Sequence, residues 1–184
     1  MRISPIVALA GLLALPPAFG QKLELKLDHL KAKAAEAAEV DLDGPALEMA
    51  LKTGFQNMVQ VPKQISADTV KQIALGIKGV YVRHFEFAKA GDYTEADVEA
   101  VLKQVRDNPA WARLVSVKEK GERVEVHLMS AGDQVAGLLV VAAEEKELTV
   151  VNVVGSIALD RLKELVSTTL HYDLTNLAGK RETP

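Results

Sequence analysis

Four consecutive segments in the second half of the chain constrain the fold most, because each has the pattern of a β-strand and the gaps between them are very short. The four candidates are residues 112–119, 122–129, 134–143 and 147–154. The separators are Lys120-Gly121, Ala131-Gly132-Asp133 and Glu144-Glu145-Lys146. Since such short connections can join antiparallel but not parallel strands, the sequence predicts an antiparallel meander.

Two of these segments differ in how their apolar residues are spaced. In residues 122–129, Val124, Val126 and Leu128 alternate with Arg123, Glu125 and His127, which indicates a sheet with the polar side chains on a solvent-exposed face. Residues 137–143 are apolar at every position, which is typical of a central strand covered on both sides.

Upstream of the meander, the apolar spacing is mostly helical. Residues 27–38 carry leucines and alanines three to four positions apart, a second helix is expected after Asp43-Gly44-Pro45, and Ser66-Ala67-Asp68 can cap a third. Residues 80–87 then alternate as a strand. A further helix is expected from Thr94 until Asn108-Pro109.

After the meander, Leu159, Leu162, Leu165 and Val166 predict a last helix. The fold class expected is therefore α+β. N-terminal helices precede a mostly antiparallel sheet of about five strands, with one inserted helix and one C-terminal helix packed on it. We expect a single domain over residues 21–174 and a flexible tail over residues 175–184.

The first 20 residues have the pattern of a cleavable secretory signal. Arg2 precedes an uncharged apolar run, Ile6 to Leu15, which is too short to span a membrane. Pro16-Pro17 and the small residues that follow predict cleavage between Gly20 and Gln21. We expect an exported protein in the periplasm or the medium, with no integral membrane segment after the signal is removed.

Composition narrows the classes of partner. The chain has no cysteine, so it can form no disulfide and cannot be lipid-anchored through a cysteine at its mature N-terminus. Its formal net charge of −3 becomes −4 when Arg2 leaves with the signal, which argues against nucleic-acid binding. Aromatic residues make up only 4% of the chain, so stacking platforms for bases or sugars are not expected.

No catalytic or metal-binding motif is found. The four histidines are far apart, and surface positions are expected for His29 and His127. Asp41-Leu42-Asp43-Gly44 resembles the start of a calcium loop, but Pro45 and Lys52 occupy ligand positions, so we interpret Asp43 as a helix cap. No Gly-x-Ser-x-Gly or phosphate loop occurs, and Glu144, Glu145 and Glu147 lie at a turn exposed to solvent. No catalytic residue, metal or cofactor is therefore predicted.

Five residues are the candidates for binding: Tyr81, Arg83, His84, Glu86 and Trp111. The first four lie on the only segment where aromatic and ionisable side chains alternate. Their parity separates them, because Tyr81 and Arg83 would face one side of the sheet and the other two the opposite side. For Trp111, the sole tryptophan, the favoured interpretation is a plug between a helix end and the sheet, and ligand contact is the alternative.

Three of these segments together resemble a known family. They are residues 79–87, residues 109–116, and residues 148–155 followed by Ile157, Leu159 and Leu162. In this order they resemble the bacterial domain of unknown function 4252 family, over about residues 27–170. The resemblance implies an exported bacterial protein of unassigned activity and carries over no site residue. Many members of that family look like lipoproteins, whereas this chain lacks the cysteine.

The leading functional hypothesis is a non-enzymatic module that binds another protein of the cell envelope. The alternative is a small hydrolase or ligand-binding protein that uses residues 81–87. A third hypothesis is a scaffold for hydrophobic small molecules, which would need a cavity between sheet and helices. The sequence predicts no oligomeric state.

Overall fold

The structure is a computed structural model that describes residues 22–53, 67–119, 121–158 and 160. Its centre is a six-stranded antiparallel sheet with the strand order β1-β2-β6-β5-β4-β3. The strands are β1 (Glu36–Asp43), β2 (Ile77–Glu86), β3 (Trp111–Glu119), β4 (Glu122–Ala131), β5 (Gln134–Ala143) and β6 (Glu147–Ala158). The α+β class and the meander β3 to β6 predicted from the sequence are confirmed.

The predicted helix over residues 27–38 is wrong for most of its length. Only Asp28–Lys31 forms a helix, α1, and the edge strand β1 begins at Glu36. β1 therefore adds a sixth strand. Its alanines and glutamates favour helix, but pairing with β2 outweighs that preference, and Arg83 of β2 forms ion pairs with Glu39 and Asp41 across the two strands.

The remaining helices lie where the sequence predicts them. They are α2 (Gly44–Lys52), α3 (Ala67–Gly76) and α4 (Glu95–Arg106). α4 begins with the expected capping box, in which Thr94 and Asp97 satisfy each other's backbone N–H groups. The predicted C-terminal helix, the tail and the cleavage site at Gly20 and Gln21 lie outside the described residues, apart from Asp160.

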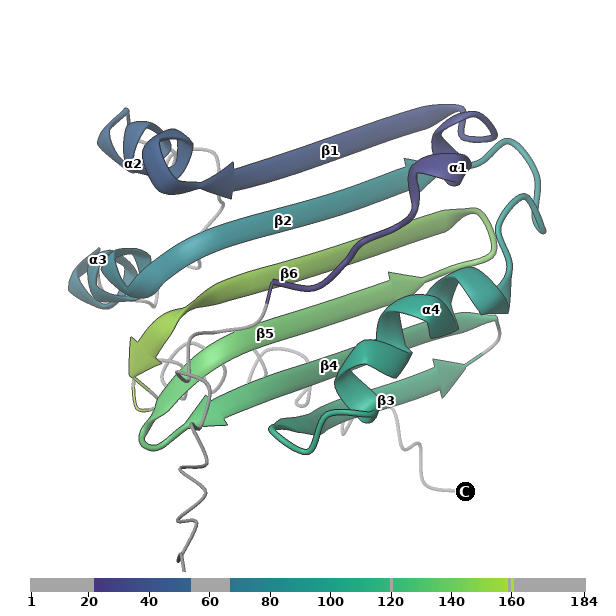
Figure 1. Cartoon of the computed structure of the whole chain (residues 1–184). Coiled ribbons are helices and arrows are strands. Elements are labelled where there is room, and N and C mark those ends of the chain that lie inside the picture. The colour runs from purple at the N-terminus through teal and green to yellow at the C-terminus, as the bar shows by residue number, and fades with distance from the viewer. Residues whose placement is uncertain (1–21, 54–66, 120, 159, 161–184) are drawn as a thin grey trace, which may run out of the picture.

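The helices lie on one face and at one end of the sheet. α4, α1 and residues 22–27 cross the face nearest the viewer in Figure 1, whereas α2 and α3 lie at the end of the sheet where β1 ends and β2 begins. We call the first of these the covered face. On this face, the apolar side of α4 packs in the same core as the sheet residues Phe85, Leu139, Val141 and Leu148, which are at most 1% exposed. The buried residues of α4 are Val98, Val101, Leu102 and Val105.

Residues 22–30 form an N-terminal strap across the covered face (Figure 1). Leu23, Leu25, Leu27 and Leu30 of the strap are buried in the core, and the residues between them are exposed. The strap has no strand partner, so side chains satisfy its backbone. The Gln104 amide bonds both the N–H and the carbonyl of Glu24 at 2.9 Å, and Oδ1 of the fully buried Asn152 accepts the Leu23 N–H at 3.0 Å. The strap is thus an integral part of the core.

We expect Leu27→Ala to lower the free energy of unfolding by about 2–5 kcal/mol, because it leaves a cavity under a side chain that is 1% exposed. Urea denaturation followed by the fluorescence of Trp111 measures this. Lys26→Ala, at an exposed position of the same strap, is the control and should change stability by less than about 0.5 kcal/mol. A Leu27→Ala protein as stable as the control would contradict the role given to the strap.

The polar side chains of β4 lie on the covered face, not in solvent as predicted. Glu125 and His127 are both 2% exposed. The Glu125 carboxylate accepts hydrogen bonds from Arg106 of α4 at 2.8 Å, from Arg123 at 2.6 Å and from His127 Nε2 at 2.8 Å. The prediction failed because Arg106 belongs to another element. Its positive charge offsets the free-energy cost of burying this carboxylate. The cluster fastens α4 to the sheet by charge as well as by packing.

The pKa of Glu125 reflects this cluster. Burial alone would raise it, but the hydrogen bond from His127 and the positive charges of Arg123 and Arg106 hold the pKa at about 2, against an ordinary value of 4.5. A carboxyl whose pKa is depressed by folding stabilises the native state above its unfolded pKa. That stabilisation is lost as the pH falls through the folded value.

We therefore expect Glu125→Gln to be less stable than the wild-type protein at pH 7, and the difference to shrink as the pH falls from 4.5 to about 2. Urea denaturation of both proteins at a series of pH values measures this difference in the free energy of unfolding. The contributions of the other carboxyl groups are the same in both proteins and cancel. A difference that stays constant over this range would show that the Glu125 charge does not stabilise the fold.

Candidate functional site

The second face of the sheet carries regular rows of aliphatic side chains, and we call it the open face. Because paired residues of neighbouring antiparallel strands point the same way, the strand register defines each row. One row contains a valine from every strand: Val115, Val126, Val140, Val151, Val82 and Val40. The next row is equally apolar and consists of Ala112, Leu128, Leu138, Val153, Val80 and Leu42.

The valine row is accessible to solvent. All six of its valines are only partly buried, and Val117 in the neighbouring row of the edge strand β3 is 46% exposed. Within the described part of the chain, no helix crosses this face, since α1 and α4 lie on the other one and α2 and α3 lie at the end (Figure 1). Near the β4–β5 hairpin, Leu128 and Val135 are buried in a small second cluster with Leu138. Between this cluster and the polar side chains of His84 and Thr149, the face is a continuous apolar surface.

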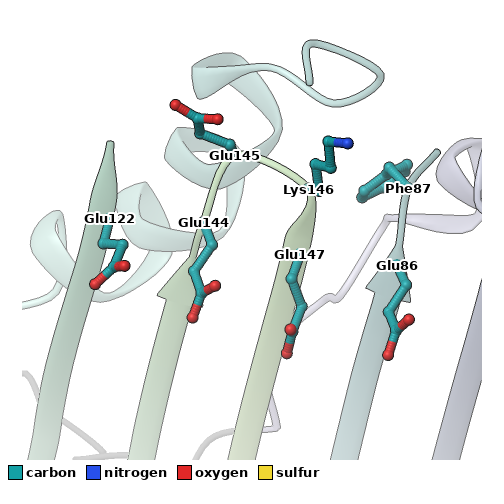
Figure 2. Close-up of a pocket in the computed structure, with 7 residues that line it drawn as sticks. All are labelled: Glu86, Phe87, Glu122, Glu144, Glu145, Lys146 and Glu147. Atoms are coloured by element: carbon teal, nitrogen blue, oxygen red, sulfur yellow. The ribbon is translucent and has the colours of Figure 1, made fainter. Parts of the chain in front are cut away.

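A row of glutamates ends the open face at the opposite end from that hairpin. Each strand contributes one at or next to its terminus: Glu119, Glu122, Glu144, Glu147, Glu86 and Glu36. Figure 2 shows the middle four side by side at the ends of β4, β5, β6 and β2, with their carboxylates pointing the same way. We call this set the glutamate row.

The glutamate row places like charges directly opposite one another. The pairs Glu119–Glu122, Glu147–Glu86 and Glu86–Glu36 are in register across neighbouring strands, an arrangement that destabilises a sheet. Among the described residues, no lysine or arginine lies within ion-pair distance of these six carboxylates. The part of the fold that the structure describes therefore holds this negative charge without a lysine or arginine partner.

His84 is the only described ionisable group with a positive form that touches the glutamate row. Its ring nitrogens lie 3.6 Å from Glu86 and 3.6 Å from Glu147, and Nδ1 is 2.9 Å from the Thr149 hydroxyl. Behind these side chains, the strand ends and the β5–β6 turn line a depression of about 520 Å³. The described His, Asp and Glu residues form no cluster with the geometry of a metal site.

The structure separates the residues that the sequence singled out for binding. His84 and Glu86 lie on the open face, whereas Tyr81 and Arg83 lie on the covered face beside the strap. Arg83 is held by Asp41 through two hydrogen bonds of 2.7 and 3.1 Å, and the Tyr81 hydroxyl donates to Asp43 at 2.8 Å. Burial and that hydrogen bond raise the pKa of Tyr81 to about 12. The four side chains therefore form no common site.

Trp111 packs in the core of the covered face. It is 8% exposed, and its ring lies so close to Gly137 of β5 that a Cβ there would meet the indole at 2.9 Å. Its indole N–H has no hydrogen-bond partner in the described structure. The tryptophan is thus part of the hydrophobic core and lies against Gly137 of β5.

Sequence reasoning missed the open face and the glutamate row, although part of the signal was present. Glu119, Glu122, Glu144 and Glu147 flank the predicted hairpins, and pairing the strands through those hairpins places them at one end of the sheet. Glu144, Glu145 and Glu147 are neighbours in sequence and suggest one solvated turn, which conceals their neighbours across the strands. The contributions of β1 and β2 needed the pairing of β2 with β6, which no local pattern indicates.

We expect Glu122→Gln to raise the free energy of unfolding by about 0.2–1 kcal/mol at pH 7 and low salt, because it removes a like-charge contact with Glu119. Urea denaturation measures the change, and added salt should shrink it by screening. Glu48→Gln on α2 removes one exposed charge away from the row and serves as the control. An equal or lower stability of Glu122→Gln would show that the row carries no internal repulsion.

Comparison with known proteins places the chain in a family without assigning an activity. Neither a curated protein nor a solved structure matches it. None of the helices in the described ranges is long and apolar enough to cross a membrane. A match to the family described as "Domain of unknown function (DUF4252)" extends over residues 33–165 and includes all six strands. This match covers most of the chain and confirms the resemblance, and the chain therefore belongs to the DUF4252 family.

Proposed function

We propose that this protein is an exported, non-enzymatic binding module of the bacterial cell envelope, and that it docks a partner protein on its open face. The observation that carries the proposal is the valine row, in which every strand presents a partly exposed β-branched side chain on the same side of the sheet. Contiguous exposed apolar surfaces of this kind mark interaction sites in soluble proteins.

The pattern of β5 supports this proposal. A strand with apolar residues at every position is typical of a sheet covered on both faces. α4 and the strap supply the cover for Leu139 and Val141 on one side. Leu138 and Val140 point to the other side and stay partly exposed. A docked partner would supply the missing layer.

Export rests on the sequence of the first 20 residues, with cleavage between Gly20 and Gln21. Because the chain has no cysteine, the mature protein would be free of a lipid anchor attached through that residue. The alternative, a hydrolase or ligand-binding site around residues 81–87, gains no support from the geometry, since its four side chains are divided between the two faces.

Site-specific photo-crosslinking in the native cells tests the proposal. We expect a photoreactive amino acid at Val117 or at Thr149, both on the open face, to form an adduct with the same envelope protein, because both positions lie on one docking surface. Mass spectrometry of the adduct identifies the partner, and the chain in it should begin at Gln21.

The same amino acid at Lys103, an exposed position on α4, is the matched control and should form no such adduct. Adducts that form equally at Lys103, or at none of the three positions, would contradict docking on the open face. A chain that begins at Met1 and stays in the cytoplasm would contradict export.

A further inference from the structure

We infer that the partner segment is an amphipathic helix of about 20 residues with an aliphatic stripe and with lysines or arginines at the end that meets the glutamate row. This inference rests on the proposed function, because it names the chemistry of the partner for the open face. It is carried by the apolar rows and the glutamate row together, since these place an aliphatic surface and a fixed band of negative charge at known positions on one face.

The dimensions of the open face favour a helix. The face is about 30 Å long, because its strands have 8–12 residues at about 3.3 Å each. A helix of about 20 residues has the same length at 1.5 Å per residue. Helices are also the usual cover for a sheet in α+β proteins, and the covered face of this chain follows that rule with α4.

The apolar rows determine the aliphatic stripe of the partner helix. The valine row and the next row, which contains Leu128 and Leu138, run across all six strands and contain no ionisable group. Between the valine row and the glutamate row, His84 and Thr149 mark the start of the polar end of the face. A helix lying along the strands would therefore contact the rows with aliphatic residues three and four positions apart in the part of its length that crosses them.

The glutamate row determines the charged end. Its carboxylates repel one another across the strands, and within the described residues no lysine or arginine pairs with them. Lysines or arginines of a docked helix would relieve this repulsion, and nearby apolar contacts would reduce screening by solvent. Such a partner converts an unfavourable feature of the free protein into a favourable contact of the complex.

A synthetic helix tests the inference on the full mature chain. The probe is a 20-residue peptide with a leucine stripe and four lysines at one end, and its twin has glutamates in place of those lysines. Fluorescence anisotropy should show binding of the basic peptide, no binding of the acidic twin, and weaker binding as salt is added.

Protein variants locate the binding site of the probe. We expect Glu122→Gln/Glu147→Gln to weaken binding of the basic peptide about tenfold, the effect of losing two partly exposed ion pairs. The control Glu24→Gln/Glu48→Gln removes the same charge at exposed positions off the open face and should leave binding within about twofold. Val140→Thr, which keeps the shape of the side chain, should also weaken binding, because it lies in the valine row.

Several results would overturn the inference. Binding of both peptides alike, or equal losses in the two double variants, would show that charge at the glutamate row does not select the partner. No binding of the basic peptide would show that another occupant, such as residues 160–184 of the same chain, takes the face. Self-association in light scattering that is lost in Val140→Thr would assign the face to a second copy. If crosslinks at Val117 and Thr149 persist in any of these cases, the docking function stands and only the partner chemistry is wrong.

Discussion

The register of the antiparallel sheet is the constraint on which the rest of the structure depends. Because β2 pairs with β6 as well as with β1, the six strands form one sheet, and residues distant in sequence lie side by side. A shift of one residue in any pair would turn that strand's side chains to the opposite face. The core, the buried Glu125 cluster, the apolar rows and the glutamate row therefore all follow from one set of backbone hydrogen bonds.

The two faces of the sheet differ in how far their apolar and charged side chains are buried and paired. On the covered face, the strap and α4 bury leucines and valines, and Arg106 and Arg123 neutralise the buried Glu125. On the open face, aliphatic rows stay partly exposed and the glutamates remain without cations among the described residues. The covered face thus stabilises the domain, whereas the described part of the chain leaves the valine row of the open face partly exposed.

Local patterns were sufficient to predict the α+β class, the meander and most helices, since hairpin-length separators and helix caps act over a few residues. The edge strand β1 could not be predicted in this way, because its residues favour helix. Its extended form is stabilised by pairing with β2, which is distant in sequence, and by the ion pairs with Arg83. The burial of Glu125 and His127 was missed for the same reason, since Arg106 lies on a helix that the strand pattern does not reveal. At the site, His84 and Glu86 were candidates from the sequence, but the valine row was not, because it forms only when six strands pair in register.

Accessibility of the open face in the free and the cellular protein tests the central claim most directly. The chain has no cysteine, so Val151→Cys creates a single thiol in the middle of the valine row. The account predicts that a maleimide labels this thiol readily in the purified mature protein and slowly in the intact envelope, where the partner covers it. Slow labelling in the folded purified protein, or equal labelling in both, would contradict an open face that serves as a docking surface.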